Sequence, residues 1–202
     1  MDSCFFHLGQ HQPSPVRPRS GSTPFSIRAA TSQDLNDLAD VLATSFHSRT
    51  GWNRWLYPVL RLGIYEDLKH RLRSSNRPYL CLVALQDICT QNDPLGATIS
   101  GTVEMTVRTA FPWSVSGFQY PYIANLAVRS GSRRQGMAGQ LLLTCETVAQ
   151  EWGFTNIYLH VLEENHRARQ LYAKLGYRLH RTETSLFGKQ NRLFLHKRLS
   201  RS

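Results

Sequence analysis

Hydrophobic residues recur at strand and helix spacing along most of the chain, beginning near Phe25. Phe25, Ile27 and Ala29 alternate with other residues, which predicts a strand. Thr31 and Ser32 then begin an apolar series at helical spacing, which predicts a helix. That series contains Leu35, Leu38, Ala39 and Leu42. A second helix is predicted from the spacing of Trp52, Trp55, Leu56, Val59, Leu60, Ile64, Leu68 and Leu72, with Pro78 as the next boundary.

The rest of the chain predicts further strands over residues 79–85, 97–108, 120–128, 156–162, 177–183 and 192–198, with helices over 136–152 and 165–175. Gly153 and Gly176 close these two helices. The strand over 97–108 alternates between an apolar face (Ile99, Val103, Met105, Val107) and a polar face (Ser100, Thr102, Glu104, Thr106). This mixed order predicts an α/β fold in which a sheet with antiparallel arms carries helices on both faces.

Residues 1–24 are rich in Pro, Ser, Gly, His and Arg and lack a periodic apolar face. We therefore expect a flexible leader over 1–24 and one folded domain over 25–199. The leader has no apolar core of a secretory signal, and it is short for an organelle transit peptide. The apolar runs are also shorter than the roughly 20 residues that a membrane-spanning helix needs, so no membrane partner is expected.

The chain of 202 residues has a formal net charge of +10, from 24 Lys and Arg against 14 Asp and Glu. This excess favours an anionic partner such as nucleic acid, acidic lipid or a phosphorylated cofactor, and charge alone does not choose among them. The basic residues are spread out, which disfavours a nucleic-acid tail. The four cysteines, Cys4, Cys81, Cys89 and Cys145, form no metal-binding or redox motif, so no metal is expected.

A predicted strand ending at Val128 leads through a basic turn into the helix that begins at Gly136. The helix start offers unpaired N–H groups and a positive dipole end, and its small residues Gly136, Ala138 and Gly139 leave room for a pyrophosphate. Arg133 and Arg134 add charge and forked donors. The spacing matches neither a nucleotide P-loop nor a dinucleotide fingerprint. A glycine-rich turn with two solvated arginines is the alternative.

Arg133, Gly136 and Ala138 stand at the spacing of the pyrophosphate signature of the GNAT superfamily of N-acetyltransferases, which the chain resembles over about residues 25–199. A second element of that family follows in order at Asn165, Ala168, Leu171, Tyr172, Lys174, Gly176 and Tyr177. The resemblance implies a mostly antiparallel sheet of about seven strands, a splayed central strand pair and acetyl-CoA as the acetyl donor, without a metal.

By this resemblance, the backbone of Leu126, Ala127 and Val128 binds the pantetheine arm, and an N–H near Leu126 stabilises the developing charge on the carbonyl oxygen. Together with the pyrophosphate turn, the expected cofactor-binding residues are Leu126, Ala127, Val128, Arg133, Arg134, Gln135, Gly136, Met137, Ala138, Gly139, Asn165 and Tyr172.

Acetyl transfer needs a neutral amine, so a base or a proton route is required. Tyr172 matches the tyrosine that protonates the leaving thiolate in the family; packing in the core is its alternative role. His160 shares one strand face with Tyr158 and is the first candidate base. Tyr122 is its expected companion, because the pair resembles that of eukaryotic enzymes that acetylate N-terminal methionine. A hydrogen-bonded core histidine is the alternative.

Glu104 is the second candidate base, on a strand expected to flank the cleft, and simple solvent exposure would equally account for it. No cysteine relay is implied, because the family transfers acetyl directly to the amine in a ternary complex. We therefore expect sequential kinetics.

The acceptor is expected at the segments least constrained by cofactor binding: the helix pair around Trp52 and Trp55, the hairpin at 111–114 and the turn at 186–190. Their aromatic residues suit a methionine or another apolar side chain at a protein N-terminus, and packing beneath the loops is their alternative role. Residues 125–128 with 158–162 most resemble the cyanobacterial and plastid branch of the family, which includes enzymes that act on protein N-termini and lysines. The short leader favours a bacterial cytoplasm over a plastid. A small-molecule amine acetyltransferase and a non-catalytic basic module that binds acetyl-CoA or nucleic acid are the alternatives.

Overall fold

The computed structural model describes residues 25–46, 57–73, 78–87, 97–109, 117–184 and 191–200. Within them, seven strands form one open sheet in the order β1-β2-β3-β4-β5-β7-β6. Every neighbouring pair is antiparallel except β4 and β5, which are parallel. The predicted fold class is confirmed.

The strands are β1 (Phe25–Ala29), β2 (Tyr79–Asp87), β3 (Ala97–Thr109), β4 (Gln119–Val128), β5 (Asn156–Leu162), β6 (Arg178–Thr184) and β7 (Asn191–Arg198). The helices are α1 (Leu35–Phe46), α2 (Tyr57–Arg73), α3 (Met137–Glu151) and α4 (His166–Lys174), with short 3-10 turns at Ser32–Asp34 and Ser130–Ser132. The leader over 1–24, the start of the predicted second helix at Trp52 and Trp55, and the segments 111–114 and 186–190 lie outside the described residues.

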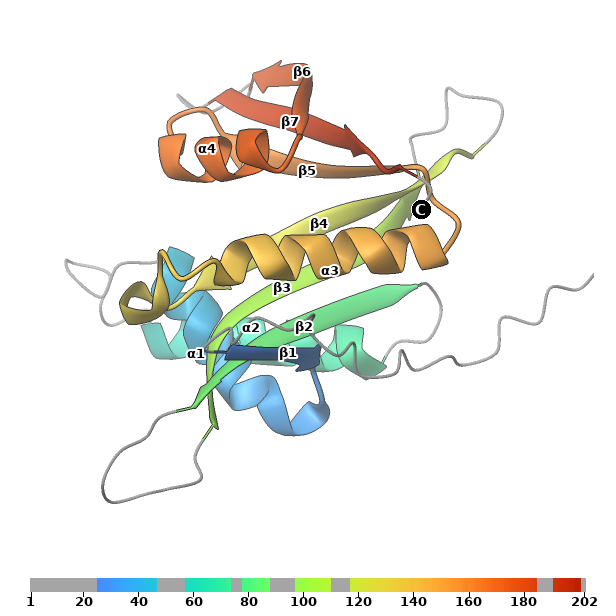
Figure 1. The fold of residues 1–202 in the computed structure, drawn as a ribbon. Helices are drawn as coiled ribbons and strands as arrows, with labels where there is room; N and C mark the ends of the chain where they lie inside the picture. Colours follow the sequence, from blue (N-terminus) through green and yellow to red (C-terminus); the bar gives the residue numbers. More distant parts are fainter. Residues whose placement is uncertain are drawn as a thin grey trace, which may run out of the picture.

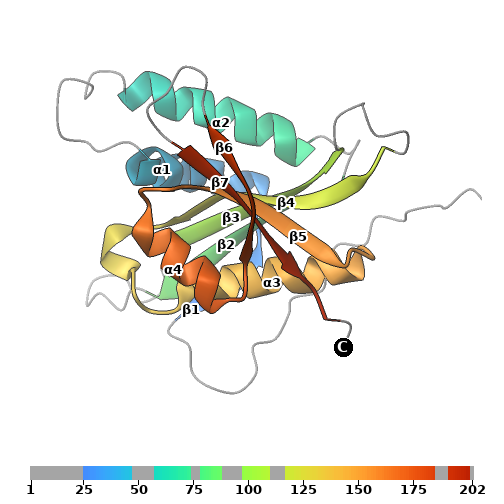
Figure 2. The ribbon, with the colours of Figure 1, turned by 90° about the horizontal axis from the view of Figure 1, so that it is seen from above.

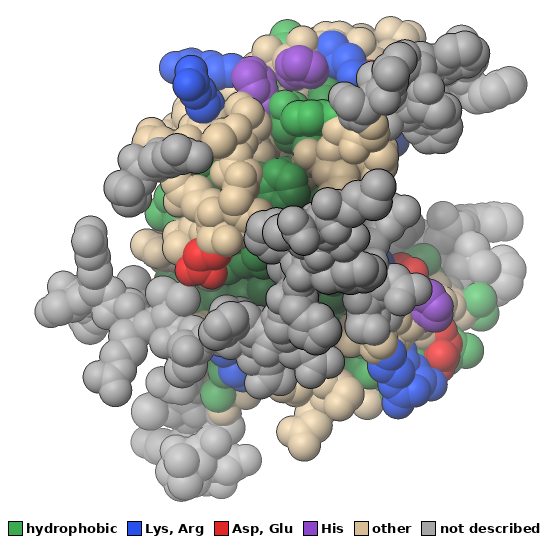
Figure 3. Space-filling model, turned by 90° about the vertical axis from the view of Figure 1, so that its right-hand side faces the viewer, with side chains coloured by type: hydrophobic (Ala, Val, Ile, Leu, Met, Phe, Trp, Pro, Cys, Tyr) green, Lys and Arg blue, Asp and Glu red, His purple; other side chains and the backbone are tan. Residues whose placement is uncertain are grey.

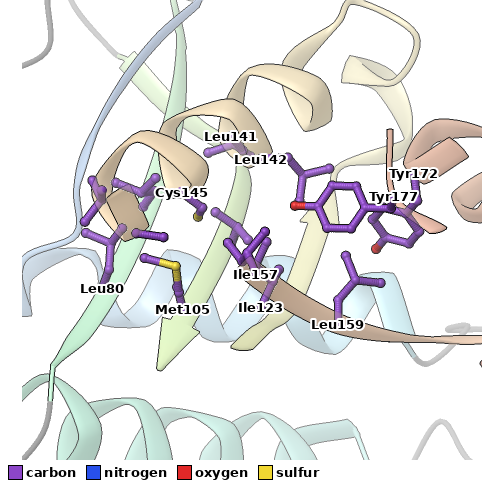
Figure 4. Packing of buried hydrophobic residues seen from close by; sticks show 14 of the residues in the cluster. Leu80, Met105, Ile123, Leu141, Leu142, Cys145, Ile157, Leu159, Tyr172 and Tyr177 are labelled. Atoms are coloured by element: carbon purple, nitrogen blue, oxygen red, sulfur yellow. The ribbon is translucent and has the colours of Figure 1, made fainter. Parts of the chain in front are cut away.

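Helices cover both faces of the sheet, as predicted. Figure 2 shows α1 and α2 on one side and α3 and α4 on the other. Each layer encloses its own apolar cluster: one joins α1 and α2 to β2 and β3, and the larger one joins α3 and α4 to the opposite face. Figure 4 shows how Met105, Ile123 and Leu159 of the sheet pack against Leu142 and Cys145 of α3 in the larger cluster.

The start of α3 is seated on β3 through a close approach at Gly101. A Cβ at Gly101 would come within 2.8 Å of the Met137 sulfur, so only glycine leaves room for Met137 to pack there. Met137, the first residue of α3, is 1% exposed. This contact fixes the N-terminal end of α3 over the middle of the sheet.

The structure adds one detail to the predicted patterns and corrects two. The polar face of β3 is not solvated, because α1 and α2 cover it and leave Ser100, Thr102 and Glu104 buried. Ile99 packs on the α1 and α2 side, away from Val103, since the register with β2 shifts between Ala84 and Leu85 and skips Ser100. Val59 is 66% exposed, because it lies one residue away from the inward row of α2 that contains Leu68.

The two parallel strands separate soon after they meet. Residue partners in the β4–β5 ladder are only Tyr122 with Tyr158 and Ile123 with Leu159. Figure 1 shows β4 and β5 diverging from there toward the N-terminal end of α3. The splayed strand pair is therefore confirmed, and β4 beyond Ile123 lacks a ladder on this side. Among the described residues no helix is long and apolar enough to cross a membrane.

Candidate active site

The turn between β4 and α3 has the shape that the sequence predicts for an anion-binding cradle. A 3-10 turn at Ser130–Ser132 leads to Gly136, the N-cap of α3, which has φ +83°. This left-handed conformation favours glycine. A Cβ at Gly136 or Gly139 would meet no atom within 4 Å, so the space over the helix start is open. The first N–H groups of α3 have no partner within the helix and can bind an anion there.

Basic and polar side chains surround this helix start. The Nε of Arg133 donates to the carbonyl of Val128 at 3.1 Å, which ties the exposed guanidinium to the end of β4. Arg134 has φ +68°, a conformation that a non-glycine residue adopts at some cost. Gln135 accepts a hydrogen bond from Gln86 of β2. Met137 is buried in the core, so only its backbone and those of Ala138 and Gly139 can face a ligand.

β4 carries a bulge where the family resemblance places the pantetheine arm. In the β3–β4 ladder, Ala124 pairs with Glu104 and Ala127 pairs with Thr102. Two residues of β4, Asn125 and Leu126, therefore lie opposite one residue of β3 and form the bulge. Asn125 has φ +52°. A bulge interrupts the ladder and re-aims backbone groups, and β4 has no ladder partners on the β5 side beyond Ile123.

The bulge is held by Glu104, which is 0% exposed. Its Oε1 accepts from Asn125 Nδ2 at 2.7 Å, and its Oε2 accepts from Arg71 of α2 at 2.7 Å and from the Tyr79 hydroxyl at 2.8 Å. Arg71 also pairs with Asp67. The alternative of a solvent-exposed Glu104 is wrong. Its three donors favour a role in anchoring α2 to the bulge.

Tyr122 and His160 meet across the β4–β5 junction, as the sequence predicts. The Tyr122 hydroxyl and His160 Nδ1 are 2.9 Å apart. His160 Nε2 lies 3.0 Å from Glu183 Oε2 of β6, and Arg181 donates to the other oxygen of that carboxylate at 2.8 Å. The three side chains Tyr122, His160 and Glu183 therefore form a chain from the strand junction to the sheet edge.

The electrostatics of this chain assign its protons. The hydrogen bond from Arg181 holds the pKa of Glu183 below its ordinary value, so the carboxylate is charged and accepts from His160 Nε2–H. Burial, opposed by Glu183, lowers the pKa of His160, which is neutral at pH 7. The lone pair on Nδ1 then accepts the Tyr122 proton. Burial also raises the pKa of Tyr122, which stays a phenol.

Tyr172 of α4 belongs to the larger apolar cluster and is 7% exposed. Burial, with a smaller effect of the nearby Tyr122, raises the pKa of Tyr172 to about 12. The phenol is therefore a proton donor at neutral pH. Asn165 is the N-cap of α4, and its Oδ1 accepts from the Ala168 N–H at 3.2 Å. This capping bond accounts for the Asn165 and Ala168 spacing without a ligand.

Sequence reasoning missed Glu183 and Asn125. Glu183 lies 23 positions after His160, and only the β5–β7–β6 order brings their strands together. Asn125 follows an ordinary strand pattern, and its positive φ results from a bulge that alternation does not reveal.

In this protein a parallel strand pair separates beside a bulge, and one of its strands leads into a helix start that can bind an anion. These features are those of an acyltransferase that uses a phosphorylated thioester as its donor. Residues 45–177 match the family model described as the acetyltransferase (GNAT) family. The chain therefore belongs to the GNAT family and is an acetyl-CoA-dependent N-acetyltransferase.

One curated protein and two solved structures illustrate what this chain is similar to. GCN5-related N-acetyltransferase 10, chloroplastic, of Arabidopsis thaliana is 28% identical over 176 residues, which cover 83% of this chain and 68% of the relative. PaiA N-acetyltransferase from Thermoplasma acidophilum, solved with coenzyme A, has a TM-score of 0.65 at 20% identity and covers 86% of this chain and 98% of that one. Arabidopsis thaliana NAA60, solved with a bisubstrate analogue, has a TM-score of 0.62 at 18% identity, covering 87% and 99%.

Proposed function

We propose that this enzyme acetylates the α-amino group of a protein or peptide, with Tyr122 and His160 as the route by which the amine loses its proton. The observation that carries the proposal is the 2.9 Å contact between the Tyr122 hydroxyl and His160 Nδ1, at the point where β4 and β5 separate. Structural likeness to NAA60, solved with a bisubstrate analogue, supports a site of this general shape.

The proton route runs along the Tyr122, His160 and Glu183 chain. When the amine nitrogen bonds to the carbonyl carbon of the acetyl thioester, it becomes acidic and can release its proton to Tyr122 Oη, while the Tyr122 proton moves to His160 Nδ1. His160 becomes an imidazolium, which the charged Glu183 carboxylate stabilises at 3.0 Å. This arrangement follows the logic of a histidine base oriented by a carboxylate.

An α-amine suits this site better than a lysine side chain. The acceptor must enter as a neutral amine, and an α-amine has a pKa of about 8 whereas lysine has about 10.4. Arg108 lies over the Tyr122 ring, with its guanidinium carbon 3.4 Å from the ring centroid, and its positive charge disfavours a second cation nearby. Less energy is needed to deprotonate the α-amine under these conditions.

Acetyl-CoA supplies the acetyl group as a thioester. We assign the N–H groups at Gly136, Met137, Ala138 and Gly139, with Arg133 and Arg134, to its pyrophosphate, and the free edge of β4 at Leu126, Ala127 and Val128 to its arm. The open space at Gly136 and Gly139 fits this assignment. We assign to Tyr172, which burial keeps protonated, the role of giving a proton to the leaving thiolate.

Transfer is direct in this proposal. Cys81 and Cys145 are buried, and burial raises the pKa of the Cys81 thiol to about 12 and raises that of Cys145. Such thiols are poor nucleophiles because they stay protonated. A covalent acetyl-enzyme trapped by mass spectrometry would contradict a sequential mechanism.

The decisive experiment offers the pure protein acetyl-CoA with a library of peptides, each with a free α-amine and an internal lysine, and maps the acetylated positions by mass spectrometry. We expect modification of α-amines. Exclusive modification of lysines, or of small amines in a parallel series, would replace the proposed acceptor class, and no thiol release with any amine would reject the proposal. Calorimetry with coenzyme A tests cofactor binding separately.

A further inference from the structure

Three arginines, Arg108, Arg181 and Arg192, lie near the Tyr122–His160 pair, and each comes from a different strand. Arg108 of β3 lies against the Tyr122 ring, and Arg181 of β6 lies over the Phe194 ring at 4.6 Å. Arg192 of β7 is the register partner of Leu162 on β5 and of Glu183 on β6. All three are exposed. In Figure 3, basic and histidine side chains gather at the upper end of the molecule, where Figure 1 places β6 and β7.

The arginines differ in what they bind. Arg181 already has partners within the protein, because it forms an ion pair with Glu183 at 2.7 Å and covers the Phe194 ring. Arg108 and Arg192 form no ion pair with any described carboxylate. Both are close enough to lower the pKa of Tyr122 and of His160. Their charges therefore act on the reaction site and are not matched by a described acidic partner.

Three connecting segments of the chain contain no acidic residue. Residues 110–116 join β3 to β4, and residues 185–190 join β6 to β7; neither sequence contains Asp or Glu. Residues 47–56, which precede α2, contain none either. Of the other carboxylates, Glu104 and Asp67 both bind Arg71, and Glu163, which follows β5, accepts a hydrogen bond from Asn191 Nδ2. Among the described residues, Glu183 is the one carboxylate in an ion pair with any of the three arginines, so positive charge is in excess beside the amine site.

We propose that Arg108 and Arg192 bind a carboxylate of the acceptor, so that the preferred acceptor is an N-terminal segment with Asp or Glu directly after its first residue. This inference rests on the proposed function and names its substrate class. A free guanidinium pair favours a carboxylate through charge-assisted, forked hydrogen bonds. The same charges repel an acceptor that carries lysine near its amine, so selectivity comes from both attraction and repulsion.

The cofactor phosphates are the other anions in this system, but their proposed site is elsewhere. The cradle at Arg133 and Gly136 follows the C-terminal end of β4, whereas Arg108 pairs in register with Tyr120 near the N-terminal end of that strand. The two basic regions therefore lie at opposite ends of β4. A change at Arg192 should alter acceptor preference and leave the KM for acetyl-CoA unchanged.

The test compares peptides that share a first residue and differ by Asp, Ala or Lys at positions two and three, measured as kcat/KM. We expect the order Asp, Ala, Lys, with roughly threefold to tenfold between successive peptides at low salt and less at high salt. Arg192→Glu should reverse the order. Arg178→Glu is the matched control, because Arg178 is an exposed β6 residue paired with His196, away from Arg192, and the change in net charge is the same.

Equal kcat/KM for Asp and Lys peptides in the wild-type protein would overturn the inference, and so would an Arg192→Glu variant that keeps the wild-type order. A rise in the KM for acetyl-CoA without a change in peptide order would reassign the arginines to the cofactor. These outcomes leave the proposed function standing, because α-amines would still be acetylated. Failure of the proposed function appears instead as no α-amine product from any peptide.

Discussion

Glu104 and Glu183 lie on the same side of the sheet, and their environments are opposite. Glu104 of β3 is fully buried and receives three hydrogen bonds, from Arg71, Tyr79 and Asn125. The side chain of Glu183 of β6 is 37% exposed and holds His160 on one oxygen and Arg181 on the other. One carboxylate joins a helix to a strand bulge, and the other ends a chain of groups that can exchange a proton.

The comparison distinguishes an acidic residue that stabilises the fold from one that can take part in proton transfer. All the bonds of Glu104 lead to other fixed groups of the fold, so no position is left for a substrate proton. The Glu183 chain ends at the Tyr122 hydroxyl, where the central strands separate. Its histidine is neutral with one lone pair directed along the chain, which is the state that a base requires. Substitutions in the two networks should therefore have different consequences.

The largest effect is expected at His160. His160→Ala removes the proton acceptor and should lower kcat/KM by about a hundredfold to ten-thousandfold. Steady-state kinetics at saturating acetyl-CoA measure this loss. His180→Ala is the control, since His180 is an exposed histidine with ring contacts on the same face, and it should keep nearly full activity. Equal rates for the two variants would remove His160 from the mechanism.

Glu104→Ala should instead act on stability. It leaves Arg71 and Tyr79 without their buried acceptor and should cost about 3 to 5 kcal/mol in the free energy of unfolding, measured with urea. Glu183→Ala, in the more exposed network, should cost about 1 kcal/mol or less. Replacing both members of the buried pair, as in Glu104→Leu with Arg71→Met, should be milder than Glu104→Ala alone. A stable Glu104→Ala protein with no activity would make Glu104 a candidate base again.

The sequence predicts some features of the fold and the site and not others. Alternation and helical spacing identify most strands and helices, because most have one face in an apolar cluster, as Leu68 of α2 and Ile157 of β5 show. Alternation also predicts which face of its strand carries His160, and the family resemblance pairs His160 with Tyr122, whose hydroxyl lies 2.9 Å from Nδ1. Local pattern also identifies the cradle at Gly136, whose conformation is set by adjacent residues.

What the sequence does not predict depends on long-range neighbours. The burial of Glu104 follows from α2 crossing β3, and the contact between His160 and Glu183 follows from the order β5-β7-β6. Bulges at Ser100 and Asn125 shift alternation by one residue, and no local signal marks them. The cytoplasmic location and the absence of a metal stay predictions.

A smaller effect is expected in the pH dependence of kcat/KM. Activity should rise as pH increases through the pKa of His160, since the neutral form is the base, and this limb should lie below the ordinary histidine value of about 6.5. Glu183 raises that pKa and Arg192 lowers it. Glu183→Gln should therefore move the limb to lower pH, and Arg192→Gln should move it to higher pH. Shifts in the same direction would contradict the proposed proton chain.

The smallest effect is expected at Tyr172. A thiol is an acceptable leaving group near neutral pH, with a pKa of about 8.5 for cysteine, so protonation assists its departure only in part. Tyr172→Phe keeps the buried ring against Tyr177 and removes only the hydroxyl. Turnover should fall by about tenfold, with coenzyme A affinity by calorimetry unchanged. Arg133→Ala with Arg134→Ala is the converse control, because loss of charge at the cradle should weaken cofactor binding. An unchanged rate for Tyr172→Phe would show that this phenol only packs, and the proton for the leaving thiolate would have to come from solvent.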